Sequence, residues 1–180
     1  MSKMPELKLA QENPMREIRI EKVVLNIGCG EAGEKLDRAK KLLESLTKKK
    51  VVTTQTHGRT TFGMAKGRPI GVRITLRGKD AMEFLKRALD AVDFKLHPRV
   101  FDSQGNFSFG VHEHIHLPGV KYEPDIGIFG MDVCVRLERR GYRVSRKRIF
   151  SRVGKPHRIT SQEAAAWAEK NLGIKITEEK

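Results

Sequence analysis

The stretch Ile70-Gly71-Val72-Arg73-Ile74-Thr75-Leu76-Arg77 alternates cleanly between apolar and polar side chains. Successive side chains of a β-strand point to opposite faces of its sheet, so this alternation predicts a strand that buries one face and exposes the other. The residues expected to face a core are Ile70, Val72, Ile74 and Leu76, and those expected to face away from it are Arg73, Thr75 and Arg77. A sheet with one covered and one open face is typical of antiparallel strands.

Apolar patterns on both sides of this strand predict the remaining elements. Alternating or β-branched runs indicate strands at 18–27, 51–56, 107–111 and 127–137. Apolar repeats at helical spacing indicate helices around 36–46 and 82–92, and a third helix is expected to end at Gly173. Capping boxes are predicted at Asp80 with Glu83 and at Thr160 with Glu163. This order of elements predicts an α+β fold, with helices packed on one face of a largely antiparallel sheet and an open face for RNA.

The chain is strongly basic and has no sign of a membrane segment. Its net charge is +14 over 180 residues, with a pI of about 10.0, which is typical of a nucleic-acid-binding protein. We expect a flexible N-terminal tail at 1–14, a single domain at 15–180, and no signal peptide or bilayer-spanning run. The cysteines Cys29 and Cys134 both fall in apolar runs, so they are expected to be buried thiols in a reducing cytoplasm.

The segment 136–158, called the basic segment below, contains ten basic residues and one acid, Glu138. Like charges at this density repel one another, so the segment should be costly to order unless a polyanion neutralises it. Arginine predominates, and its planar guanidinium suits phosphate oxygens and can stack on bases. A solvated arm without a partner is the alternative. The basic residues are Arg136, Arg139, Arg140, Arg143, Arg146, Lys147, Arg148, Arg152, Lys155 and Arg158.

A long loop at 56–69 joins two predicted strands. It contains three glycines, cations and hydroxyls but no acid, and it is much longer than a tight hairpin connection. With cations for phosphate and Phe62 available to lie against a ribose or base, we expect the loop to contact a second RNA. A mobile surface loop without a partner is the alternative.

Three motifs match known catalytic or binding patterns, but their surroundings in the sequence argue against those functions. The GxGxxG match at 28–33 has Glu31 where a pyrophosphate would lie, and no acid follows about 20 residues later, so a glycine turn is preferred to a nucleotide site. The HExxH match at 112–116 lies between Gly110 and Pro118, which leaves too little room for a zinc-binding helix, so we expect it to continue the preceding strand. Both phenylalanines of the 105–111 stretch are expected in the core rather than stacked on RNA. We find no catalytic set, no metal site and no cofactor site.

Three blocks of the chain resemble the 5S rRNA-binding ribosomal protein family, large-subunit protein five. The blocks read VVLNIGCGEA at 23–32, RPIGVRITLRG at 68–78 and FDSQGNFSFGV at 101–111. The resemblance runs from about Met15 to Gly173. The stretch 122–148 and the run Ala164-Ala165-Ala166-Trp167 look like the archaeal and eukaryotic branch rather than the bacterial one.

The resemblance implies a structural, non-enzymatic role on the cytoplasmic ribosome. The family binds 5S rRNA, helps to attach it to 23S rRNA in the central protuberance, contacts small-subunit ribosomal protein thirteen and approaches P-site tRNA. It implies no small-molecule substrate and no membrane partner. The subunit-bridge side is matched loosely by 102–106 and 112–119.

Particular residues carry these expectations. Asn26 and Thr75 match positions on the open face that hydrogen-bond 5S rRNA. Lys48-Lys49-Lys50 replaces a glutamine that bacterial relatives tend to have, which suggests phosphate contact there. The expected rRNA-binding residues are Arg16, Arg19, Asn26, Gly28, Lys48, Lys49, Arg73, Thr75, Arg77, Arg139, Arg140, Arg143, Arg146 and Arg148. The expected tRNA-contacting residues are Arg59, Thr60, Phe62, Lys66 and Arg68.

Two other functions remain as alternatives at this point. One is a nucleotide-dependent enzyme that uses the glycine turn at 28–33. The other is a free RNA or DNA chaperone, which would bind unrelated duplexes with similar affinity.

Overall fold

A computed structural model describes residues 13–59, 65–149 and 151–177 of the chain. Its centre is a five-stranded antiparallel sheet with the strand order β2-β3-β1-β6-β5. The strands are β1 (Ile18–Gly28), β2 (Val52–Gln55), β3 (Pro69–Leu76), β5 (Phe107–Val111) and β6 (Met131–Arg139). A small parallel pair, β4 (Lys95–Leu96) and β7 (Lys175–Ile176), lies apart from this sheet.

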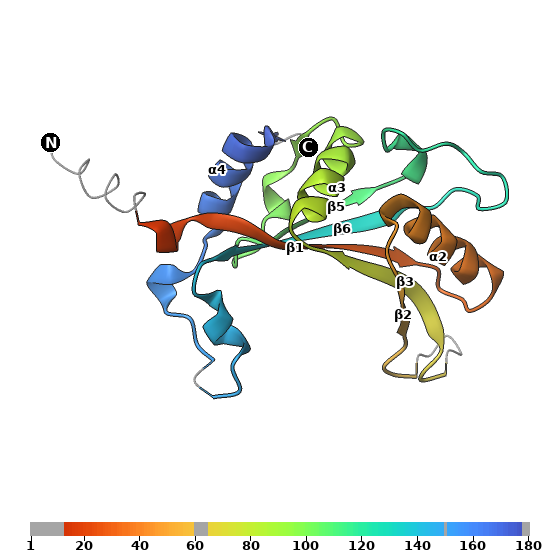
Figure 1. Cartoon of the computed structure of the whole chain (residues 1–180), viewed down its shortest axis with the longest axis horizontal. Helices are drawn as coiled ribbons and strands as arrows, with labels where there is room; N and C mark the ends of the chain where they lie inside the picture. The colour runs from red at the N-terminus through yellow and green to blue at the C-terminus, as the bar shows by residue number, and fades with distance from the viewer. Residues whose placement is uncertain (1–12, 60–64, 150, 178–180) are drawn as a thin grey trace, which may run out of the picture.

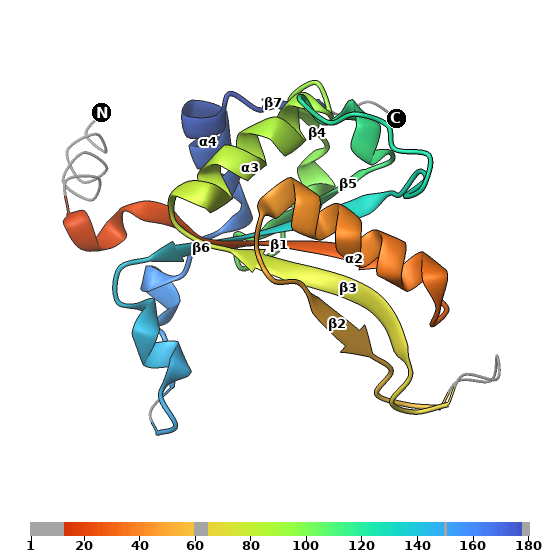
Figure 2. The same ribbon diagram turned by 45° about the vertical axis from the view of Figure 1, so that its right-hand side comes forward.

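Three helices cover one face of the sheet and leave the other uncovered (Figures 1 and 2). They are α2 (Glu34–Thr47), α3 (Lys79–Asp90) and α4 (Ser161–Leu172). The sheet residues on the covered side are buried, among them Leu25, Val72, Ile74 and Val133. The predicted α+β architecture and the alternation along β3 are therefore confirmed, because Arg73 and Thr75 are exposed between buried neighbours.

Five short 3-10 helices complete the described chain. They are η1 (Pro14–Arg16), η2 (Pro98–Val100), η3 (His114–His116), η4 (Tyr142–Arg146) and η5 (Lys155–His157). The last two lie in the basic segment, which projects from the sheet on the side away from the helices (Figure 1). The β2–β3 hairpin projects on the same side at the other end of the sheet, so that the two projections flank the uncovered face (Figures 1 and 2).

Two predicted helix and strand boundaries are wrong. The capping box at Asp80 and Glu83 does not form, because α3 begins at Lys79 after Gly78, which has a φ of 63°; the Asp80 carboxylate pairs with Lys49 instead. The strand predicted from 127 begins only at Met131, and Ile128 is 56% exposed. The capping box at Thr160 and Glu163 is confirmed, with both of its hydrogen bonds present.

Two further predictions are wrong. A strand was expected to continue where the chain turns, and a buried cysteine was expected at an exposed position of an alternating strand. Residues 112–116 do not extend β5, since His114–His116 form the 3-10 turn η3. Cys29 is buried as expected, but Cys134 is exposed. Cys134 lies between two buried valines of β6, on the uncovered face. Most of the predicted tail at 1–14 lies outside the described residues.

Candidate nucleic-acid interface

The uncovered sheet face, called the open face below, places polar side chains from neighbouring strands side by side. Asn26 on β1 is paired in register with Arg73 on β3 and with Asp132 on β6. Its side-chain amide donates a long hydrogen bond of 3.4 Å to the Asp132 carboxylate. Two residues earlier on β1, Val24 is paired with Thr75 of β3 on one side and with Cys134 of β6 on the other. The predicted residues Asn26, Arg73 and Thr75 therefore share one surface, whereas sequence alone did not indicate Asp132 or Cys134.

Charge on the open face is mostly positive. Lys22 and Arg136 are paired in register on β1 and β6, and Arg73 lies further along the face. Partial burial raises the pKa of the Cys134 thiol, and the nearby Asp132 carboxylate raises it further. The thiol therefore stays protonated at neutral pH, so it adds no negative charge to this surface.

Two acids on the sheet neutralise part of the basic segment. The Glu21 and Glu138 side chains are each only 9% exposed, and both pair with Arg146. Glu138 also pairs with Arg19 at 2.5 Å, and Glu21 with Arg136 at 2.8 Å. The β1–β6 register shifts between Ile20 and Lys22, which places Glu21 at the irregularity. The sequence count found one acid within the segment, but it could not show that a second one reaches the segment from β1.

Arg139 differs from the other arginines of the segment because its side chain is only 5% exposed. Its guanidinium donates to the carbonyls of His157 and Arg158, each at 3.3 Å, and pairs with Glu163 at 3.1 Å. All of these partners belong to the protein itself. Arg139 therefore holds the far end of the basic segment against β6 and α4, and we leave it out of the proposed RNA contacts.

Other arginines of the basic segment, which do not pair with Glu21 or Glu138, are available at the surface. Arg140 makes only a loose 3.5 Å contact with Glu17, and both side chains are more than half exposed. Arg143 and Arg148 are exposed and make no ion pair within the part of the chain that the structure describes. Arg16, at the end of η1, is exposed as well.

The lysines after α2 lie away from the open face. Lys48 ends α2 in a left-handed conformation, with a φ of 52°. Lys49 pairs with Asp80 on α3, and both lysines line a hollow between α2 and α3 on the helix side of the sheet. Gly28 and Arg77 are exposed at the ends of β1 and β3.

The loop at 56–69 begins as a continuation of the β2–β3 hairpin. The Thr56 N–H donates to the Arg68 carbonyl at 2.9 Å, and the Gly67 N–H donates back to the Thr56 carbonyl at 3.0 Å. Arg59, Lys66 and Arg68 are exposed. The expected contacts Thr60 and Phe62 lie outside the described residues.

The geometry gives no support to the three motifs set aside above. The Cys29 and Gly30 amides, which a nucleotide phosphate would need, both donate to the Ile70 carbonyl at 2.9 and 3.0 Å. His114 is 1% exposed, and its Nδ1 accepts from the Phe129 N–H at 3.3 Å, so it is a core residue. Phe107 and Phe109 are buried, as expected.

The described residues show neither a metal-binding cluster nor a helix that could span a membrane. No group of three or more His, Cys, Asp or Glu side chains could hold a metal ion among the described residues. None of the described helices combines the length and apolar character needed to cross a membrane.

Comparison with known proteins agrees with the resemblance found in the sequence. Residues 13–59 match the family model of ribosomal protein L5, and residues 69–167 match that of the ribosomal L5P family C-terminus. The chain is 50% identical to large ribosomal subunit protein uL5 of Nanoarchaeum equitans, over 92% of this chain and 99% of the relative. It is 48% identical to uL5 of Archaeoglobus fulgidus, over 94% and 95% of the two chains. The uL5 of Pyrobaculum aerophilum is 47% identical over 98% and 99%.

Proposed function

Because the chain belongs to the ribosomal protein L5 family, in its archaeal-type form, we propose that it binds 5S rRNA through the open face of its sheet. It is a structural protein of the large ribosomal subunit and not an enzyme. The bound 5S rRNA would be attached to 23S rRNA in the central protuberance with the help of the basic segment.

One observation carries this proposal: the open face is polar, uncovered and flanked by two basic projections. Asn26, Thr75 and Arg73 lie on adjacent strands of that face. Arg143 and Arg148 extend the positive surface on one side, and the β2–β3 hairpin does so on the other. Hydroxyl and amide groups can recognise RNA shape and 2′-hydroxyls, while the arginines neutralise phosphates.

The loop at 56–69 is proposed to contact P-site tRNA. Its stem is fixed by the Thr56 hydrogen bonds, so the exposed Arg59, Lys66 and Arg68 side chains are held away from the sheet. This arrangement suits contact with a second RNA while 5S rRNA occupies the open face.

The contact with small-subunit ribosomal protein thirteen is proposed for the 112–119 side. Residues 102–106 and 112–119, which were both matched to the bridge, lie at opposite ends of β5. A five-residue strand separates them by roughly 17 Å, so they do not form one compact surface. His112 and His116 are exposed on the second stretch, so the basic segment does not cover them.

A filter-binding titration with 5S rRNA tests the central proposal. Unlabelled tRNA and duplex DNA are added as competitors, at low and at near-physiological salt. We expect 5S rRNA binding to survive added salt while the competitors fail to displace it, because the folded RNA fits the open face. If all three nucleic acids bind alike and salt abolishes them together, only the net charge is acting and the proposal is wrong.

A further inference from the structure

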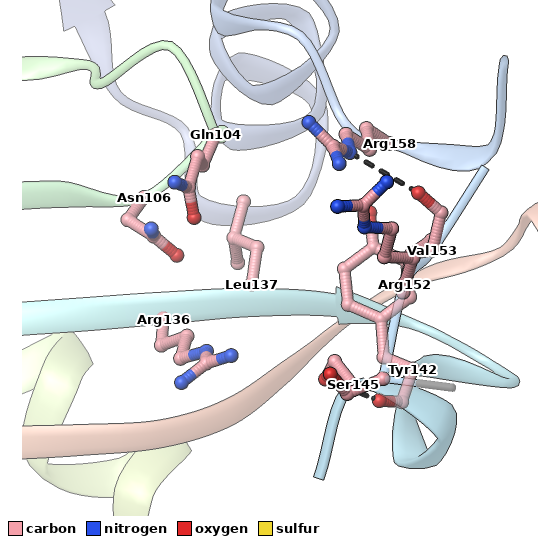
Figure 3. A pocket seen from close by; sticks show the side chains of 10 residues that line it. Gln104, Asn106, Arg136, Leu137, Tyr142, Ser145, Arg152, Val153 and Arg158 are labelled. Carbon is pink, nitrogen blue, oxygen red and sulfur yellow. Dashed lines mark hydrogen bonds between the residues drawn. The ribbon is translucent and has the colours of Figure 1, made fainter. Parts of the chain in front are cut away.

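A cleft of about 230 Å³ lies where the basic segment meets the sheet (Figure 3). β6 contributes Arg136 and Leu137 to its lining, and these two side chains extend to opposite sides of the strand (Figure 3). Gln104 and Asn106, just before β5, stand on one side, and Arg152 and Arg158 of the basic segment stand on the other (Figure 3). The arrangement brings carboxamides and guanidinium groups from distant parts of the sequence to one small space.

The carboxamide side of the cleft is held rigidly. The Asp102 N–H donates to the Asn106 carbonyl at 2.8 Å, and the Gly105 N–H donates to the Asp102 carbonyl at 2.9 Å. Gly105 packs so closely on Ile159 that an added Cβ would lie 2.5 Å from the Ile159 Cγ2. The backbone that carries Gln104 and Asn106 is therefore fixed relative to the basic segment.

Neither carboxamide has a hydrogen-bond partner for its side chain within the described residues. Each carboxamide offers both a donor and an acceptor, which is the combination that pairs with the edge of a nucleobase. Gln104 is exposed and Asn106 is half-buried, so both carboxamides remain accessible to a ligand.

The opposite side of the cleft is positively charged. Arg158 donates through Nε to the Val153 carbonyl at 3.3 Å, which fixes the guanidinium and leaves its terminal nitrogens free for a ligand. Arg152 lies on the same side (Figure 3), and no carboxylate is among the described residues that line the cleft. Two neighbouring guanidinium groups without an acid between them attract a phosphate.

We propose that this cleft binds one unpaired nucleotide of 5S rRNA, with its base against Gln104 and Asn106 and its phosphate against Arg152 and Arg158. The inference rests on the proposed function and adds a specific subsite to it. A second hollow on the open face shares Asn106 and Arg136 with the cleft, so a nucleotide bound there stays connected to RNA that crosses the sheet. A base within a duplex could not reach this site, because its edges are stacked and paired.

The test combines base removal in the RNA with removal of the carboxamides in the protein. Single abasic substitutions are introduced at each unpaired position of 5S rRNA, and affinities are measured for the full-length protein and for a Gln104→Ala, Asn106→Ala double variant. Gln162→Ala, which removes an exposed carboxamide on α4, is the matched control. Melting curves establish that each variant is folded.

One abasic position is expected to weaken binding by the unchanged protein roughly fivefold to hundredfold, the range for a single bound base. The same position should weaken binding by the double variant by less than about twofold, whereas Gln162→Ala should behave like the unchanged protein. If 5S rRNA is preferred but no position shows this coupling, the cleft inference is wrong and the proposed function stands. If the unchanged protein itself shows no preference for 5S rRNA over tRNA and duplex DNA, both the cleft inference and the proposed function are wrong.

Discussion

The phenol oxygen of Tyr142 accepts a hydrogen bond from the backbone N–H of Ile159 at 3.0 Å, across 17 residues of sequence. The same hydroxyl donates to the His157 carbonyl at 3.1 Å, and the rings of Tyr142 and His157 meet edge to face, with centroids 5.6 Å apart. The start and the end of the projecting part of the basic segment are thus joined by the protein's own contacts. This closure places Arg152 and Arg158 beside β6.

Tyr142→Phe should loosen the basic segment. The change leaves the N–H of the buried residue Ile159 without its partner, so we expect a loss of about 1–3 kcal/mol in the free energy of unfolding. Trypsin should also cut between 143 and 155 faster than in the unchanged protein. Tyr122→Phe is the control, since Tyr122 is 54% exposed. Equal cleavage rates in the two variants would show that the Tyr142 hydroxyl does not hold the segment.

Arg139 and Arg140 are adjacent but should have separate roles. Arg139→Ala removes two carbonyl hydrogen bonds and the ion pair with Glu163, so we expect a stability loss of about 2–3 kcal/mol in urea unfolding. Arg140→Ala should leave stability nearly unchanged and lower the salt-dependence slope of 5S rRNA binding by about 1, as expected for one lost phosphate contact. The assignment fails if Arg139→Ala is as stable as Arg140→Ala.

Stability at acidic pH should report on Glu163. Burial alone would raise the pKa of this carboxyl, but the hydrogen bond from the Thr160 N–H and the charge of Arg139 outweigh burial and hold the pKa below its ordinary value of 4.5. A lowered pKa in the folded state stabilises the protein above the unfolded-state pKa, and this stabilisation is lost as the pH falls through the folded-state value. The stability advantage over Glu163→Gln should therefore be fully present well above the unfolded-state pKa and should shrink as the pH falls below it.

Urea unfolding of both proteins across this range measures the effect. Glu169→Gln is the control, because Glu169 is an exposed carboxyl on the same helix. A stability difference between the unchanged protein and Glu163→Gln that does not vary with pH would contradict the proposed coupling to Arg139.

Short-range patterns predicted the sheet, the helices and the core, because alternation and helical spacing are local properties of the sequence. The alternation from Ile70 to Leu76 and the capping box at Thr160 both appear as expected. Cys134 was misplaced because it sits between two apolar residues, Val133 and Val135, although the alternation puts it on the same face as Asp132 and Arg136. Asp80 was misplaced because Lys49, 31 residues away, provides its partner.

The candidate site was predicted only in part, for the same reason. Asn26, Arg73 and Thr75 followed from alternation and resemblance, and the structure places them on one face. Long-range pairing decided the rest. Glu21 reaches Arg146 across 125 positions, and Arg139 turns inward to the carbonyls near η5. A charge count within one segment cannot detect either arrangement.

Gly105→Ala should destabilise the protein more than Gly119→Ala. Both glycines have a positive φ, 76° and 82°, so both substitutions carry the backbone strain of about 1–2 kcal/mol. Only at Gly105 would the new Cβ also collide with the buried residue Ile159, whereas nothing lies within 4 Å at Gly119. We expect the difference in unfolding free energy to exceed about 1 kcal/mol in urea titrations. Similar losses would mean that the packing of the 102–106 turn on Ile159 is loose.

The open face and the hairpin loop should be separable by mutation. Asn26→Ala with Thr75→Ala removes polar groups from the open face, so the preference for 5S rRNA over duplex DNA should fall roughly fivefold to hundredfold. Arg59→Ala with Lys66→Ala removes two exposed cations of the loop and should leave that preference nearly intact. Competition filter binding measures both ratios, and Thr75→Val separates loss of the hydroxyl from loss of the β-branched side chain. Equal losses from the two pairs would show that the RNA is held by charge spread over both projections rather than by the open face.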